Sequence, residues 1–157
     1  MARGTSLGAM VHSTTLGMLV KNAEYTFLLL EAYEDEIAGA AYFDGLAAAY
    51  PQHSAFLEKC AALERATASQ LNALIRKYQM IPQSQQTLEV RGATYARKDS
   101  AGEWQALMQR SIDSYPRYVT EFKALEAIGP PEDQPILAAL TEHELQLIEW
   151  MRAETTS

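Results

Sequence analysis

A continuous helical periodicity over residues 22–50 is the feature that most constrains the fold. Apolar and aromatic side chains recur there every three or four residues, which is the spacing of one face of an α-helix. The stripe consists of Leu29, Tyr33, Glu36, Ala40, Phe43, Ala47 and Tyr50. Only one of these side chains is charged. The pattern predicts one long helix from about Asn22 to Ala49, and the helix is expected to end there because a residue before a proline disfavours helical backbone.

A second helical stripe starts directly after Pro51 and continues to a stop near Pro82. Its members are Leu57, Cys60, Glu64, Thr67, Leu71, Leu74 and Tyr78. Because the join between the two helices is very short, they are expected to be antiparallel neighbours.

The rest of the chain predicts a crossover followed by a second hairpin. Residues 80–101 lack helical periodicity and are expected to be a crossover connection, partly extended around LEVRGATY. A third helix is predicted over 101–128, kinked or divided at Pro116, and a fourth over 134–153. Two antiparallel hairpins joined by a long crossover make an all-α fold, the ferritin-like form of the four-helix bundle.

Length and composition favour a single globular domain over residues 1–157, with residues 1–15 as a flexible arm or a short docking segment. The chain is 48% hydrophobic and 21% charged, and its net charge of −7 argues against nucleic acid and against an anionic membrane surface. The longest strongly apolar run, FLLL at 27–30, is too short to span a bilayer, and we expect no signal peptide. The single cysteine, Cys60, rules out an intrachain disulfide and fits a cytoplasmic protein.

Two carboxylates interrupt the two apolar stripes at the same depth. Glu36 lies 14 residues before Tyr50, and Glu64 lies 13 residues after Pro51. At about 1.5 Å of rise per residue, antiparallel helices hold these side chains at nearly the same level. Facing carboxylates in a core are costly unless a cation or a shared proton neutralises them.

The fourth helix carries a further polar pair, His143 and Glu144. Helical geometry places Glu144 near the centre of the apolar face and His143 toward one edge. The third helix offers no inward carboxylate at this level. Tyr115 and Tyr118 are its polar side chains best placed to reach the site.

Three segments resemble the ferritin-like superfamily, most closely its rubrerythrin-like branch, over about residues 22–154. They are EIAGAAYFDGLA, LEKCAALERATASQL and TEHELQLIEW. The resemblance implies a diiron-carboxylate centre, with one Glu from each of two helices and Glu-x-x-His from each of the other two. Glu36 and Glu64 match this set.

The match to the diiron set is incomplete. Thr67 stands where the first histidine is expected, and we expect its hydroxyl to bond a backbone carbonyl one turn back. If His143 is the second histidine, Leu140 replaces its glutamate; if Glu144 is that glutamate, Leu147 replaces its histidine. Cys60 could supply a thiolate ligand, but packing is the simpler role for a buried free cysteine.

Two functional hypotheses follow. The first is a ferritin-like metalloprotein that binds iron or manganese through Glu36, Glu64, Glu144 and His143 and carries out oxidoreductase chemistry. The second is a metal-free helical bundle that binds a partner or an unidentified small-molecule ligand, with protonated or hydrogen-bonded core carboxyl groups. A homodimer is expected, and the substrate is not identified by the residues.

Overall fold

The computed structural model describes residues 7–156, which contain α-helices and short 3-10 turns and no β-strand. The all-helical prediction is therefore confirmed for this part of the chain. The helices are α1 (Leu7–Ala49), α2 (Ser54–Lys77), α3 (Gln85–Asp99), α4 (Trp104–Ser114), α5 (Pro116–Ile128) and α6 (Gln134–Thr155). The 3-10 turns are η1 (Pro51–His53) and η2 (Pro131–Asp133).

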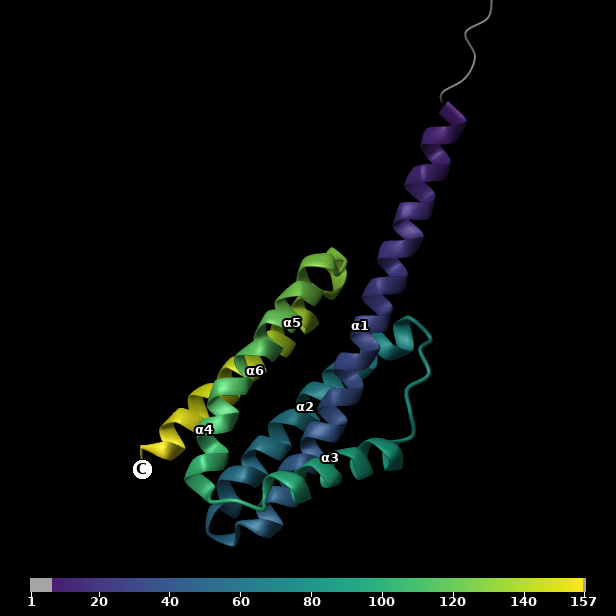
Figure 1. Ribbon diagram of the computed structural model, residues 1–157. Helices are drawn as coiled ribbons and strands as arrows, with labels where there is room; N and C mark the ends of the chain where they lie inside the picture. Colours follow the sequence, from purple (N-terminus) through teal and green to yellow (C-terminus); the bar gives the residue numbers. More distant parts are fainter. Residues whose placement is uncertain (1–6, 157) are drawn as a thin grey trace, which may run out of the picture.

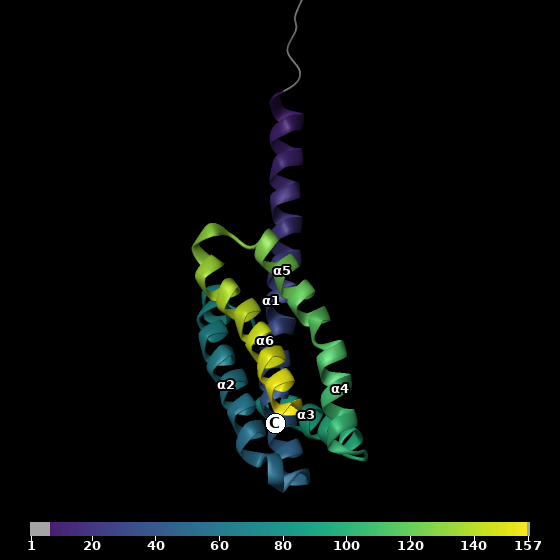
Figure 2. The ribbon, with the colours of Figure 1, turned by 90° about the vertical axis from the view of Figure 1, so that its left-hand side faces the viewer.

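The helices form two hairpins that enclose a common core. Helices α1 and α2 run antiparallel, and the α4–α5 pair returns through η2 into α6 (Figure 1). Helix α6 packs against α2, α4 and α5, while α1 packs against α5. In the perpendicular view, α2, α6 and the α4–α5 pair again lie along the lower part of α1 (Figure 2). The expected division at Pro116 is present, because α4 ends at Ser114 and α5 begins at Pro116.

Two apolar clusters fill the core, one toward each end of the bundle. One cluster contains Phe43, Leu46, Leu57, Trp104, Leu147 and Met151. The other contains Tyr25, Leu29, Leu71, Phe122, Leu137 and Leu140. In the sequence of each helix, Glu36, Glu64 and His143 fall between residues of the two clusters. The candidate site therefore occupies the middle of the bundle.

The expectation of an irregular, partly extended crossover at residues 80–101 is wrong, because α3 occupies most of it. Ser84 caps the helix by accepting a hydrogen bond from the backbone N–H of Thr87 at 3.1 Å. The buried side of α3 consists of Leu88, Gly92 and Ala96. Only Leu88 on this buried side is a large apolar residue, so the sequence shows no repeating apolar pattern that would predict a helix. Small residues serve here because α3 packs very closely on α1.

Gly92→Ala is expected to destabilise the protein by about 1–3 kcal/mol, the usual cost of overpacking. A Cβ at this position would lie 2.0 Å from the carbonyl oxygen of Ala38, so α3 would have to move away from α1. Urea denaturation measures the change, with Gly17→Ala as the control because nothing lies within 4 Å of a Cβ there. An unchanged midpoint in Gly92→Ala would contradict the close α1–α3 contact.

Helix α1 begins earlier than the periodicity predicts. It starts at Leu7, so the flexible arm expected over residues 1–15 is wrong for residues 7–15, and residues 1–6 lie outside the described part of the chain. The N-terminal turns project beyond the other helices (Figures 1 and 2), and side chains such as Leu16 and Leu19 are exposed there. Because residues 15–24 are exposed, they need no single apolar face. Among the described helices, none combines the length and apolarity that crossing a membrane requires.

A buried carboxylate joins the far end of the second hairpin to the first. Asp133 accepts hydrogen bonds from Tyr25 at 2.8 Å and Tyr78 at 2.6 Å, and it pairs with Lys77 at 2.5 Å. Burial alone would raise the pKa of Asp133, but the hydrogen bonds from these three side chains outweigh burial and lower it. These contacts fix η2 against α1 and α2.

Asp133→Asn is expected to cost about 1–3 kcal/mol of stability at neutral pH, because it weakens bonds to buried donors. The pKa of Asp133 is lower in the folded protein than the ordinary value of 3.8. Its contribution is therefore complete above the unfolded pKa and is lost as pH falls through the folded pKa. Thermal unfolding from pH 7 to pH 2 should show the two proteins converging at the acid end, and a constant difference would contradict this.

Candidate metal centre

The structure brings together all four of the side chains that the sequence singles out. Glu36 comes from α1, Glu64 from α2, and His143 and Glu144 from α6. Their exposed fractions are 2%, 4%, 4% and 5%, so all four are buried. The predicted shared depth of Glu36 and Glu64 is confirmed, since both approach the same ring nitrogen of His143.

Three of these residues form a compact set of ligand atoms. Nε2 of His143 lies 3.0 Å from Oε2 of Glu36 and 3.8 Å from Oε1 of Glu64. One ligand atom from each of the three residues lies within 4.8 Å of the others. Oε1 of Glu144 lies 3.8 Å from the same Nε2, but Glu144 is not part of this three-residue group.

Nε2 of His143 and Oε2 of Glu36 lie at ion-pair distance, 3.0 Å, but neither atom makes a hydrogen bond of standard geometry to a described residue. In the part of the chain that the structure describes, Oε2 of Glu36, Nε2 of His143 and Oε2 of Glu144 are buried and have no hydrogen-bond partner. Such atoms are costly in a core, and an unpaired group normally has a water, an ion or a functional reason. Three of them meet here at one level of the bundle.

The orientation of the His143 ring is set by its other nitrogen. Nδ1 contacts the carbonyl oxygen of Leu140 one turn earlier in α6. This contact requires a proton on Nδ1, so in the neutral imidazole the lone pair is on Nε2, which faces the two carboxyl groups. Metal-binding histidines are held in this way by a second hydrogen bond.

Burial raises the pKa values of all three carboxyl groups. Burial raises those of Glu36 and Glu64 well above their ordinary value, and the charge of Glu36 raises that of Glu64 further. Burial, assisted by the charge of Glu64, raises the pKa of Glu144 to about 8. The group therefore needs either protons or a cation to be stable in the core.

Gly39, one turn after Glu36, makes room for the Glu64 carboxyl group. A Cβ at position 39 would lie 2.7 Å from Oε2 of Glu64. Gly39→Ala is expected to displace that carboxyl group and weaken metal binding about tenfold or more, by analogy with lost supporting contacts at metal sites. The fold should persist because the displaced group is the end of a flexible side chain.

Isothermal titration with Mn(II), together with thermal unfolding, checks this prediction. Gly17→Ala is the matched control, since it also lies within α1 and has open space around it. Equal affinity in Gly39→Ala and the control would show that the packing of Gly39 against Glu64 is unimportant for the site.

The remaining sequence expectations concern nearby side chains. Thr67 donates its hydroxyl proton to the carbonyl oxygen of Leu63 at 3.0 Å, as expected. Cys60 lies in an apolar cluster, and burial raises the pKa of its thiol to about 12, which disfavours a thiolate ligand. His143, expected toward one edge of the apolar face, is 4% exposed, because α6 packs against α2, α4 and α5. Gly39 was not identified from sequence, because a lone helical glycine carries no chemical signal.

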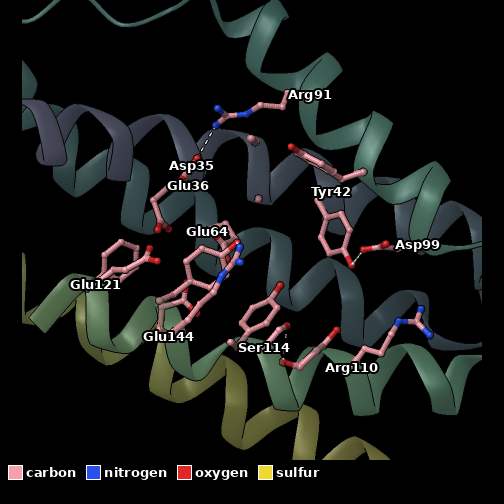
Figure 3. A pocket seen from close by; sticks show the side chains of 18 of the residues that line it. Asp35, Glu36, Tyr42, Glu64, Arg91, Asp99, Arg110, Ser114, Glu121 and Glu144 are labelled. Atoms are coloured by element: carbon pink, nitrogen blue, oxygen red, sulfur yellow. Dashed lines mark hydrogen bonds and ion pairs between the residues drawn. The ribbon is translucent and has the colours of Figure 1, made fainter.

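A pocket of about 500 Å³ connects the carboxyl groups with the surface between the two hairpins. Glu36, Glu64 and Glu144 line its inner part, and the exposed Glu121 and Arg110 also line it. Figure 3 shows the glutamates grouped toward one end, with Asp99 and Arg110 toward the other. Tyr115 and Tyr118, the side chains expected to reach the site from the third predicted helix, also line the pocket.

The chain matches no protein-family model, and neither curated proteins nor solved structures show a significant match to it.

Proposed function

We propose that this protein is a ferritin-like metal-binding protein that holds one divalent ion on Glu36, Glu64 and His143. The main support is the buried group of ligand atoms around Nε2 of His143, which lies 3.0 Å from Oε2 of Glu36 and 3.8 Å from Oε1 of Glu64. One ligand atom from each of the three residues lies within 4.8 Å of the others. An ion between them would coordinate Nε2 and neutralise the two carboxyl groups.

Charge also supports a cation at this position. Glu36 and Glu64 carry two negative charges when ionised, and a divalent ion would neutralise both. The Nδ1 contact of His143 with Leu140 supports a ligand role for Nε2, as at metal sites where the second ring nitrogen is held by a carbonyl oxygen.

The donor set favours iron or manganese among the available metals. Carboxylate oxygens suit manganese and imidazole suits iron, so a set of two carboxylates and one imidazole accepts either ion. In the described residues, Cys60 is not part of the ligand group. A bound iron or manganese ion would supply redox chemistry, and the pocket would give small molecules access to it.

The proposed ferritin-like architecture is supported by two helical hairpins with a long connection between α2 and α4, which includes α3. The proposed site differs from a diiron centre in its ligands. Over residues 7–156, α4 and α5 contribute nothing to the three-residue group, and Thr67 is bonded to its own helix. These residues suffice for one ion, with Glu144 as an additional nearby carboxyl group.

Anaerobic titration of chelator-treated protein with Fe(II), and separately with Mn(II), tests the proposed function. We expect one ion per chain, and we expect Glu64→Ala to abolish uptake. Glu58→Ala is the control, because this exposed glutamate lies on the same helix. If neither ion binds the unmodified protein, the metal-binding proposal is wrong.

The second candidate function is metal-free binding of a small molecule. The specific observation in its favour is the pocket of about 500 Å³, a size typical of ligand sites. In that case, protons would neutralise Glu36 and Glu64, whose pKa values are raised by burial. The metal titration separates the two candidates.

A further inference from the structure

The pocket beside the candidate metal centre is lined by charged groups of both signs. Its lining includes six carboxyl groups and three guanidinium groups, a formal excess of three negative charges. The carboxyl groups belong to Asp35, Glu36, Glu64, Asp99, Glu121 and Glu144, and the guanidinium groups to Arg91, Arg110 and Arg117. This excess equals Glu36, Glu64 and Glu144, whose pKa values burial raises, so these groups are ionised only when a cation takes the place of their protons. A divalent ion would serve Glu36 and Glu64, which leaves Glu144.

Two carboxyl groups that line the pocket, those of Glu36 and Glu144, have an oxygen without a hydrogen bond in the described part of the chain, and Glu36 belongs to the candidate metal centre. Glu144 is 5% exposed and lines the pocket, and its Oε2 has no hydrogen-bond partner among the described residues. The arginines do not meet this need. Arg91 pairs with Asp35 at 2.8 Å and Arg117 donates to the Tyr118 hydroxyl at 2.8 Å, while Arg110, the third, makes no hydrogen bond to Oε2 of Glu144. A buried carboxylate oxygen without a donor is an acceptor for a cationic ligand.

Aromatic rings form a wall that ends at His143, the neighbour of Glu144 in α6. The Arg117 guanidinium lies over one face of the Tyr118 ring, 4.7 Å from its centroid. The rings of Tyr115 and Tyr118 lie 5.6 Å apart, those of Tyr118 and Phe122 lie 6.4 Å apart, and Phe122 lies 6.1 Å from the His143 ring. Tyr115, Tyr118 and Phe122 also line the pocket. Aromatic faces next to carboxylates are the setting in which proteins bind ammonium groups.

We propose that this pocket binds a small organic ammonium compound, with its nitrogen donating to Glu144 and its carbon skeleton packed against Tyr115, Tyr118 and Phe122. The volume of about 500 Å³ accommodates a molecule with one aromatic ring. The inference goes beyond the proposed function and does not require a bound metal, because Glu144 lies outside the three-residue metal group.

Three probes of nearly equal size and different charge test the proposal: benzylamine, benzyl alcohol and benzoate. Binding is measured by isothermal titration to the full chain, both after chelation and in the presence of Mn(II). We expect benzylamine to bind in both conditions, at least about tenfold more tightly than either other probe. Equal or tighter binding of benzoate or benzyl alcohol would overturn the proposal, as would no benzylamine binding at about 10 mM.

Two variants locate the ammonium group. Glu144→Gln should weaken benzylamine binding about tenfold or more, whereas Glu142→Gln, an exposed neighbour on α6, should leave it unchanged. Tyr118→Leu should weaken it about threefold or more through the lost aromatic face, and this variant decides the matter if Glu144→Gln does not fold. Unchanged affinity in the folded variants overturns the proposal.

The two metal conditions keep this inference distinct from the proposed function. Benzylamine binding to the chelated protein supports the ammonium site even if no metal ever binds. Benzylamine binding that requires Mn(II) and is lost in His143→Ala would instead show a neutral amine on the metal, and would overturn the ammonium site.

Discussion

His143→Ala is expected to lower the affinity for Fe(II) and Mn(II) by at least about 100-fold, since even loss of a supporting contact at a metal site costs 10- to 100-fold. Nε2 of His143 lies 3.0 Å from Glu36 and 3.8 Å from Glu64, and it is the nitrogen donor of the three-residue group. Without it, two carboxyl groups remain, and carboxylates alone do not favour iron over the more abundant hard cations. Competition titrations with a chelator of known affinity measure the loss.

The control for this variant is His53→Ala. His53 is half-buried at the end of the bundle, where it stacks on Trp104 and contacts Glu154 at 3.0 Å. Its removal should leave metal affinity unchanged while testing whether loss of any histidine perturbs the bundle. Equal loss of affinity in both variants would indicate a general effect on the fold, and undiminished affinity in His143→Ala would exclude His143 as a ligand.

Glu36→Gln and Glu64→Gln are expected to affect the metal-free and metal-loaded proteins in opposite directions. In the metal-free protein, each variant should raise the free energy of unfolding by about 1–2 kcal/mol, because a neutral amide removes the cost of burying a carboxylate beside another. Burial raises the pKa values of both groups well above their ordinary value, which is the same cost expressed as proton uptake.

With metal present, only the unmodified protein should gain stability. A ligand at about 100 times its dissociation constant stabilises a protein by about 2.7 kcal/mol, and the glutamine variants should lose most of this gain. Urea denaturation with and without Mn(II) gives the free energy of unfolding of the unmodified protein and of each variant. If the metal-free variants are less stable than the unmodified protein, the carboxyl groups of Glu36 and Glu64 stabilise the core without a metal. If Mn(II) stabilises both variants as much as the unmodified protein, Glu36 and Glu64 are not ligands.

The shared depth of Glu36 and Glu64 could be predicted because a very short turn joins their helices. The register of two such helices follows from counting residues, and the structure places both carboxyl groups beside His143. The burial of His143 could not be predicted by counting residues. His143 lies about 100° from Glu144 around α6, so a single narrow apolar face cannot contain both side chains. Both are buried because α6 packs against α2 on one side and against α4 and α5 on the others.

Helix α3 and the first turns of α1 show a different limit of hydrophobic spacing. Helix α3 packs through Gly92 and Ala96, and a contact between small residues and backbone leaves no apolar stripe in the sequence. Residues 15–24 of α1 are exposed, so burial does not pattern their sequence. Gly39 belongs to the same class, because its role is to leave space for Glu64.

Anomalous diffraction from crystals of the Mn(II)-loaded protein is the most direct test of the central claim, which is one ion held by Glu36, Glu64 and His143. We expect a single strong anomalous peak at mid-bundle, about 2.0–2.3 Å from one atom of each residue. Hydrogen bonds between protonated carboxyl groups at this position, with no peak there or a peak elsewhere, would show that these residues do not bind the ion.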